Sequence, residues 1–108
     1  MTRFHLSRSA KKDYKKILID SMRQFGVFQQ EHYRQLLDLA MEEVAANPMK
    51  PRTKARDDLG SGIRTYSIAK RGRNASHQLY FRVGQDGIVA ILRILHIRME
   101  VSRHFPHQ

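Results

Sequence analysis

The sequence of 108 residues contains no cysteine and no tryptophan, and it has only three prolines, six glycines and ten acidic side chains. Without cysteine the chain has neither a disulfide nor a thiolate metal site. Glycine-rich phosphate loops and zinc-ligand spacings are missing as well, so we expect no cofactor and no bound metal. No apolar run is long enough for a membrane helix or a signal peptide, and we therefore expect a cytoplasmic protein without a membrane partner.

The small number of acidic residues leaves a large positive charge. Twenty Lys and Arg residues face ten Asp and Glu, which gives a formal charge of +10 and an isoelectric point near 10.5. Residues 25–46 carry one basic and four acidic side chains, whereas the segments on either side are strongly basic. Such a surface attracts acidic partners, and composition alone leaves an acidic protein, a nucleic acid and an anionic membrane open.

Two helices are predicted in the first half of the chain, separated by Gly26 and forming an antiparallel hairpin. Ser7 or Ser9 caps the first helix at its N-terminus. The second helix ends at Asn47-Pro48, with Asn47 in the left-handed conformation that often follows a last helical turn. The apolar face of the first helix comprises Tyr14, Ile17, Leu18, Ser21 and Phe25. The apolar face of the second, which has the clearest helical period, comprises Tyr33, Leu36, Leu37, Ala40, Met41 and Val44.

Strands are predicted in the second half of the chain. Residues 88–95 are apolar at every position except Arg93, which is typical of a strand buried on both faces, and we expect this strand at the centre of a sheet. Residues 79–83 alternate between apolar and polar side chains before it. The Asp-Gly pair within Gln85-Asp86-Gly87 predicts a hairpin turn between the two strands.

Four shorter segments complete the predicted layout. Residues 3–6 alternate as a short opening strand does, and residues 63–69 predict another strand, joined to the next by a basic connection at residues 70–76. Residues 49–62 have no apolar period and predict a surface loop. We therefore predict one domain over residues 1–108 with an α+β fold: a helical hairpin packed on a small, mostly antiparallel sheet, in the order strand, helix, helix, strand, strand, strand, short C-terminal helix.

Candidate chemistry rests on one histidine and three arginines. Arg64, Arg82 and Arg93 lie within predicted strands, where an unpaired charge is costly to bury, so each either faces solvent or meets a carboxylate or phosphate. For Arg64 and Arg82 both outcomes stay open, whereas for Arg93 we expect a carboxylate. The carboxylates considered for Arg93 are those of Asp57, Asp58 and Glu100. His96 directly follows the predicted central strand, and an imidazole there can perform acid-base chemistry, although a structural capping role is commoner.

Several motifs point together to one family. The first predicted helix contains LSRSAKKDYKKI, the helices meet at Phe25-Gly26, and the second ends at Ala46-Asn47-Pro48. A strand carries Tyr80-Phe81-Arg82-Val83, and the most specific block is ILRILHIRMEVSRHF at residues 91–105. Over roughly residues 4–105 the sequence resembles the ParE toxins of the ParE/RelE superfamily, which are the toxic halves of type II toxin-antitoxin modules.

The resemblance implies a toxin that binds DNA gyrase and blocks replication without catalysis. It also implies a ParD-like antitoxin whose acidic C-terminal segment wraps the toxin, and contact with nucleic acid that is at most indirect. The residues expected to contact the target are Arg64, Arg82, His96, Arg98 and Arg103. From the broad apolar face of the first helix we expect the antitoxin to bind in a groove at Tyr14, Leu18 and Met22.

Two alternatives remain beside this interpretation. RelE toxins have a similar fold but cut mRNA on the ribosome, using basic residues and a C-terminal Tyr or His. Because this chain has no Tyr beyond Tyr80, the nuclease chemistry would fall to His96 or His104 together with Arg64 and Arg82. The other alternative is a plain basic nucleic-acid-binding module, which predicts salt-sensitive binding to bare DNA without toxicity.

Overall fold

The computed structural model describes residues 3–70 and 73–105, where the chain forms two long helices and a five-stranded sheet. This α+β architecture, with the helical pair before most of the sheet, confirms the predicted fold class. None of the helices in the described ranges is long and apolar enough to span a membrane. In chain order the elements are β1 (Phe4–Leu6), α1 (Arg8–Phe25), α2 (Val27–Ala46), β2 (Lys54–Ala55), β3 (Arg64–Lys70), β4 (Arg73–Val83), β5 (Val89–His96) and the 3-10 turn η1 (Val101–His104).

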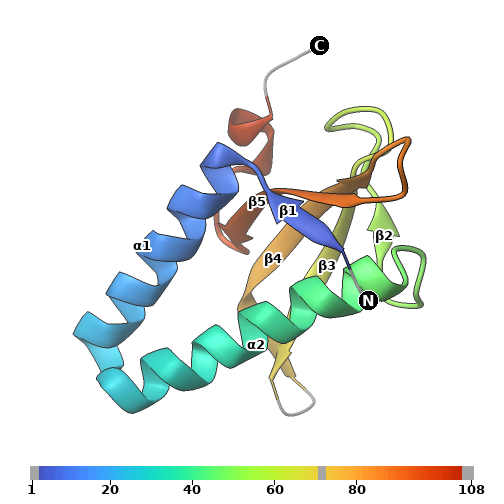
Figure 1. The fold of residues 1–108 in the computed structure, drawn as a ribbon. Coiled ribbons are helices and arrows are strands. Elements are labelled where there is room, and N and C mark those ends of the chain that lie inside the picture. The colour runs from blue at the N-terminus through green and yellow to red at the C-terminus, as the bar shows by residue number, and fades with distance from the viewer. Residues whose placement is uncertain (1–2, 71–72, 106–108) are drawn as a thin grey trace.

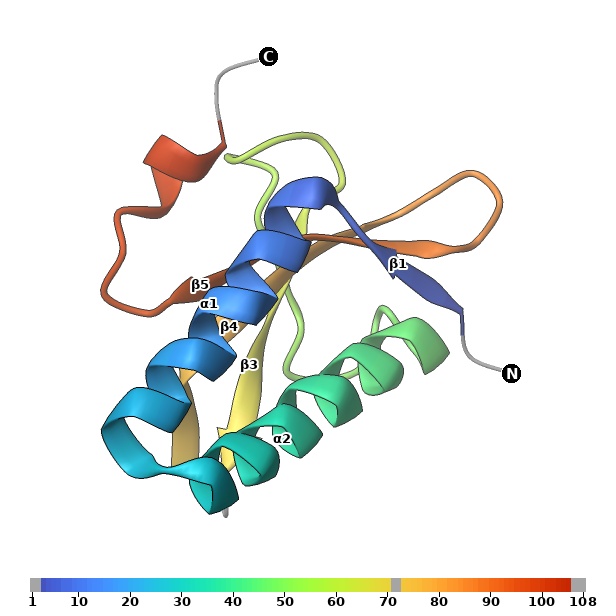
Figure 2. The ribbon, with the colours of Figure 1, turned by 60° about the vertical axis from the view of Figure 1, so that its left-hand side comes forward.

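Both helices lie on one face of the sheet (Figures 1 and 2). They diverge from Gly26 like the arms of a V, so that α1 runs over β5 and α2 crosses towards β3. The predicted helical hairpin is therefore present, but its helices separate as they leave the turn. The space at the junction of the V is closed by the ends of β4 and β5, and this is where a pocket forms.

The helix ends show which sequence signals operate. The Ser7 hydroxyl oxygen accepts a hydrogen bond from the Ala10 amide at 3.0 Å and donates to the Leu92 carbonyl at 2.7 Å, so Ser7 both caps α1 and ties it to β5. Gly26 ends α1 with φ at 89°, a conformation that glycine adopts without strain. Asn47 follows α2 with φ at −150°, so the prediction of a left-handed Asn47 was wrong.

The sheet has the strand order β1-β5-β4-β3-β2, in which β1 pairs with β5 in parallel and the other pairs are antiparallel. The middle strand is β4, so the expectation that residues 88–95 form the central strand is corrected. β5 is nevertheless an interior strand because β1 covers its outer edge, and this explains its almost continuous apolar run.

Two predicted connections contain more structure than expected. The loop predicted at residues 49–62 includes the two-residue strand β2, which pairs with the start of β3. The connection predicted at residues 70–76 is mostly strand, because β3 continues through Lys70 and β4 begins at Arg73. Residues 71–72 lie outside the described residues. Backbone pairing across a hairpin does not need an apolar period, which is why the sequence pattern missed both extensions.

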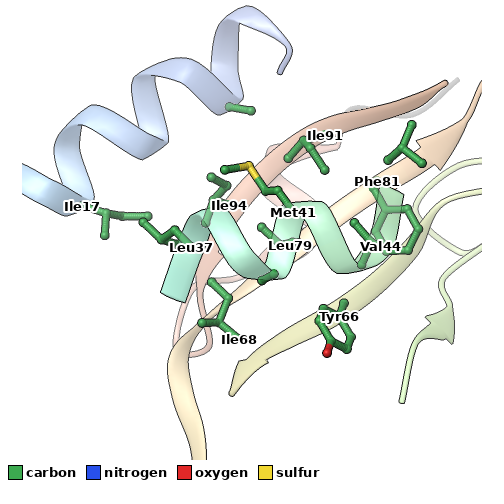
Figure 3. Packing of buried hydrophobic residues seen from close by; sticks show 13 residues of the cluster. Ile17, Leu37, Met41, Val44, Tyr66, Ile68, Leu79, Phe81, Ile91 and Ile94 are labelled. Atoms are coloured by element: carbon green, nitrogen blue, oxygen red, sulfur yellow. The ribbon is translucent and has the colours of Figure 1, made fainter. Parts of the chain in front are cut away.

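The main core lies between the helices and the sheet (Figure 3). Leu37, Met41 and Val44 of α2 are buried and face sheet residues such as Leu79 and Phe81. The predicted apolar face of α2 is thus confirmed, and each fully buried side chain of this kind contributes about 1.5–3 kcal/mol to folding. The face predicted for α1 fails at its C-terminal end, where Phe25 is 67% exposed because the helix has run past the sheet.

A smaller apolar cluster covers the opposite face of the sheet. Leu59 and Ile63 from the loop after β2 pack with Tyr80 and Leu95 from the sheet. Side chains of the C-terminal segment, including Phe105, complete this cluster. The segment after β5 therefore returns across the sheet face that the helices leave open.

Candidate functional site

A pocket of about 760 Å³ opens where α1 and α2 meet the ends of β4 and β5. Buried Ile17 and Ile94 contribute apolar surface to it, and Tyr33, His77 and His96 contribute polar groups. Its volume lies in the range of ligand-binding pockets. The pocket brings together residues that are more than sixty positions apart in the chain, and sequence spacing alone does not reveal it.

The polar wall is a contiguous group of one tyrosine and two histidines. His77 of β4 is directly opposite His96 of β5, and their ring centroids are 5.2 Å apart with the planes at 82°. The Tyr33 hydroxyl from α2 lies 2.7 Å from His77 Nδ1. Helix and sheet therefore meet through a hydrogen bond at this point, and His96 is the member of the group that the sequence had already indicated.

Burial sets the protonation of this group. It raises the pKa of Tyr33 to about 12 and lowers the pKa of His77 to about 4. The neighbouring His96 also lowers the pKa of His77, while the carboxylates of Asp13 and Asp20 partly oppose the shift. At neutral pH Tyr33 is therefore a phenol and His77 a neutral imidazole.

The hydrogen bonds assign the ring protons. We assign the Tyr33 hydroxyl as the donor to His77 Nδ1, which leaves the ring proton of His77 on Nε2. His96 Nδ1 accepts the backbone N–H of Arg98 at 3.0 Å, so a neutral His96 also carries its proton on Nε2. Each histidine thus presents an Nε2 donor, which suits binding of an acceptor such as a carboxylate.

An ion pair holds α1 against β5 beside the pocket. The Asp13 carboxylate accepts from Arg93 Nε at 2.8 Å and Nη2 at 2.9 Å, and also from the Ile94 amide at 2.9 Å. Arg93 Nη1 lies 3.2 Å from His104 Nδ1. The prediction that Arg93 meets a carboxylate is confirmed, but the partner is Asp13 rather than any of the three residues considered. Asp13 was missed because the pairing joins the first helix to the last strand.

Arg64 and Arg82 lie far along the strands from His96. Arg64 pairs with Phe81, and Arg82 with Ala90, six residues before His96 on β5. At about 3.3 Å per residue this places Ala90 about 20 Å from His96. Arg82 follows Phe81 directly, so its side chain points to the sheet face opposite that of Arg64. The structure therefore does not bring Arg64, Arg82 and His96 together.

Both arginines hold loops. Arg64 Nη2 donates to the Thr53 hydroxyl at 2.8 Å, and its Nε is buried with no hydrogen-bond partner in the described part of the chain. Arg82 Nε donates to the Ser61 carbonyl at 2.9 Å. Neither forms an ion pair within residues 3–70 and 73–105. The alternatives left open for these arginines are thus answered by loop contacts, and the loops are those on either side of β2.

The remaining predicted target contacts lie at the pocket and beyond it. Arg98 is exposed and lines the pocket two residues after His96. Arg103 is exposed in η1, and next to it His104 contacts Arg93. In the described ranges neither Arg98 nor Arg103 has an ion-pair partner. His96, Arg98 and Arg103 therefore form the accessible part of the predicted set in the C-terminal segment.

The residues predicted to bind the antitoxin differ in accessibility. The Tyr14 hydroxyl donates to Asp38 at 2.7 Å, and burial together with this carboxylate raises its pKa to about 12. Leu18 is half-buried against the main core, whereas Met22 is 52% exposed. Of the three, Met22 offers the most free apolar surface. Antitoxin binding at these residues stays a prediction.

Tyr33 and His77 are the pocket residues that sequence reasoning missed. Tyr33 was assigned to the core face of α2, and His77 stood at the edge of a predicted connection. If the pairing continued regularly from the hairpin turn, His96 would pair with Ser76. A bulge shifts the register by one residue between Phe81 and Tyr80, so His96 pairs with His77 instead. The paired histidines therefore depend on an irregularity that no sequence signal marked.

Among the described residues no group of three or more His, Cys, Asp or Glu side chains is arranged to hold a metal ion.

Residues 4–101, which are most of the chain, match the protein family described as "ParE toxin of type II toxin-antitoxin system, parDE". The chain belongs to the ParE toxin family. The resemblance inferred from the motifs is confirmed. Proteins named Toxin ParE1 from two strains of Mycobacterium tuberculosis are 34% identical to it over 103 residues, covering 95% of this chain and 97% of theirs.

A solved structure supports the same fold. The chain is similar to one from the chromosomal ParDE system of P. aeruginosa, with a TM-score of 0.72 and 18% identity over 91% of this chain and 98% of the other. At that identity the likeness concerns the fold alone. The ParE fold thus places its helical V over the sheet as described above, and the pocket lies at the junction of the V.

Proposed function

We propose that this ParE-family toxin arrests growth by binding DNA gyrase and that it acts without catalysis. The observation that carries the proposal is the distance of about 20 Å along β5 between His96 and the strand position that pairs with Arg82. Side chains that start from strand positions this far apart are poorly placed to act on one scissile bond, because a catalytic group must lie within hydrogen-bond reach of the atom it serves. The same spacing fits within a protein interface of about 800 Å² per partner.

The proposed gyrase contacts are the accessible cations of the C-terminal segment together with the arginines near β2. His96, Arg98 and Arg103 provide the first group, and Arg64 and Arg82 the second. Arginine is well suited to such contacts, because its planar guanidinium binds carboxylates in two-point geometry and is weakly hydrated. Because gyrase acts on the chromosome, the proposal puts the toxin's action in the cytoplasm.

Neutralisation by a ParD-type antitoxin completes the proposal. A net charge of +10 favours rapid encounter with an acidic segment, since complementary charge raises association rates. Apolar contacts then determine how long the complex lasts. A disordered acidic segment that folds on the toxin combines both features.

A supercoiling assay tests the proposal directly. Purified toxin is expected to inhibit DNA supercoiling by gyrase, and Arg98→Ala with Arg103→Ala is expected to weaken inhibition by about tenfold, as loss of interface arginines commonly does. Arg3→Ala removes an exposed cation directly before β1 and serves as the control. Undiminished supercoiling at saturating toxin would refute gyrase as the target.

One observation favours the RelE-type alternative. Neutral His77 next to His96 and Tyr33 in a pocket provides groups that can act in general acid-base catalysis. This alternative predicts cleavage of mRNA in a translation extract and loss of cleavage in His96→Ala. Inhibition of gyrase with intact mRNA supports the leading proposal, and cleavage that needs His96 supports the alternative.

A further inference from the structure

The carboxylates that line the pocket at the junction of α1 and α2 already have hydrogen-bond or ion-pair partners within the chain. Asp13 is held by Arg93 and the Ile94 amide, and Asp20 pairs with Lys16 at 2.9 Å. The groups left to meet a ligand are mainly donors: the Nε2 groups of the two histidines, and the guanidinium of Arg98. The titratable and charged groups that line the pocket are Asp13, Lys16 and Asp20 from α1, His32 and Tyr33 from α2, His77 and His96 from the sheet, and Arg98.

Neither histidine Nε2 has a hydrogen-bond partner among the described residues, and both rings line the pocket. Their Nδ1 atoms are occupied by the Tyr33 hydroxyl and by the Arg98 amide, which hold the rings in place. Two donors fixed on adjacent strands suit an acceptor with two oxygens. A carboxylate fits this description.

The pocket also has exposed apolar walls. Phe25 is 67% exposed at the end of α1, and Met99 is 43% exposed after β5. Large apolar side chains that line a pocket and remain exposed mark contact sites for other proteins. Methionine adapts its shape to the side chain that it meets. The pocket thus combines donors for one carboxylate with a surface for an apolar neighbour.

We propose that this pocket anchors the acidic segment of the antitoxin: one carboxylate accepts hydrogen bonds from the Nε2 groups of His77 and His96, and a neighbouring apolar side chain packs on Phe25 and Met99. The inference rests on the proposed function, because it assigns a place to the antitoxin. The charge of +10 favours an acidic occupant.

Occupation of the pocket explains neutralisation. His96 and Arg98 belong to the proposed gyrase contacts, and an antitoxin residue seated between them covers both.

Calorimetric titration of the toxin with a ParD-type antitoxin tests the inference. His96→Leu is expected to lower affinity by about tenfold or more, which is the effect of losing one hydrogen bond to a charged group. His96→Gln keeps a donor near the Nε2 position, so its affinity is expected to stay within about threefold of that of the unmodified toxin. His5→Leu removes an exposed histidine on β1, away from the pocket, and is expected to leave the affinity unchanged.

The outcomes separate this inference from the proposed function. If the antitoxin binds His96→Leu as tightly as the unmodified toxin, the segment docks elsewhere and the inference fails while the toxin assignment stands. If the antitoxin does not bind the unmodified toxin, both fail. A single-stranded RNA oligonucleotide that binds the toxin and is lost in His96→Leu would assign the pocket to nucleic acid and overturn the inference. Circular dichroism of each variant shows that the fold is retained, and Phe25→Ser provides a second test at the apolar wall.

Discussion

Ionisable side chains have different surroundings and different contacts at the two ends of the sheet. At the pocket end, defined by Tyr33, His77 and His96, burial keeps a phenol and an imidazole neutral and leaves N–H donors for a ligand. At the arginine end, defined by Arg64 and Arg82, the guanidinium groups hold the loops around β2. Burial against the helices, rather than residue type alone, decides which end of the sheet forms a pocket and which end holds loops through arginines.

The two ends of the sheet also differ in the kind of contact that their side chains can make. A neutral polar pocket with apolar walls favours selective contact with a few atoms of a partner. The arginine end instead holds half-buried guanidinium groups that bond to Thr53 and Ser61. The pocket end therefore keeps donors available to a ligand, whereas the arginine end uses donors to hold loops.

The largest expected effect is at the ion pair beside the pocket. Asp13→Ala leaves the Arg93 cation and the Ile94 amide without their acceptor, so we expect the free energy of unfolding to fall by about 2–4 kcal/mol. Urea denaturation at neutral pH measures it. Lys16→Ala breaks the exposed pair with Asp20 and should cost below about 0.5 kcal/mol. Equal costs for the two variants would show that Asp13 does not organise the pocket end.

The next effect concerns His77 and pH. The pKa of His77 is about 4 in the folded chain and near 6.5 when unfolded, so the unfolded chain binds more protons between these values and stability falls as pH drops through this window. After discounting for solvent screening, we expect this to cost roughly 1–2 kcal/mol between pH 7 and pH 5. His77→Asn keeps an acceptor for Tyr33 and should remove that part of the pH dependence.

Thermal melts of both proteins at the two pH values provide the measurement. His5→Asn is the matched control, because His5 is an exposed histidine on β1. A pH dependence in His77→Asn as steep as in the unmodified chain would mean that His77 is not held neutral by the fold.

A smaller effect is expected at the arginine end. Thr53→Val removes the hydroxyl that accepts from Arg64 and donates to the Lys50 carbonyl, so the free energy of unfolding should fall by about 1 kcal/mol. Thr53→Ser keeps the hydroxyl and should behave nearly as the unmodified chain in urea denaturation. If Ser and Val variants lose the same stability, the methyl group rather than the hydrogen bond holds this loop.

The smallest effect is expected for Arg82. Its Nε bond to the Ser61 carbonyl lies near solvent, so Arg82→Met should cost below about 0.5 kcal/mol of global stability. Amide hydrogen exchange should nevertheless quicken in the loop around Ser61, because that loop loses its tie to β4. Unchanged exchange there would show that Arg82 does not brace the loop, and Arg3→Met is the control for loss of an arginine.

Much of the fold could be predicted from the sequence, because apolar periodicity and helix-capping residues agreed with the folded structure. The period of apolar residues in α2 matched the buried face, and Ser7 acted as the cap that its side-chain chemistry favours. Of the candidate site, only His96 and Arg98 could be predicted from the sequence. His77 and Tyr33 beside His96, and the Asp13 partner of Arg93, come from other elements, and neither spacing nor periodicity reports contacts of that kind.

By itself the sequence determined the helical pair, the strands after it, the strong positive charge and the ParE motifs, because each of these is a property of neighbouring residues or of composition. Only the tertiary structure decided which ionisable groups meet. A one-residue bulge at Leu92 of β5 sets His77 opposite His96, and the divergence of α1 and α2 brings Tyr33 to them. Register and helix direction result from packing the whole core, so the pocket exists only once the chain has folded.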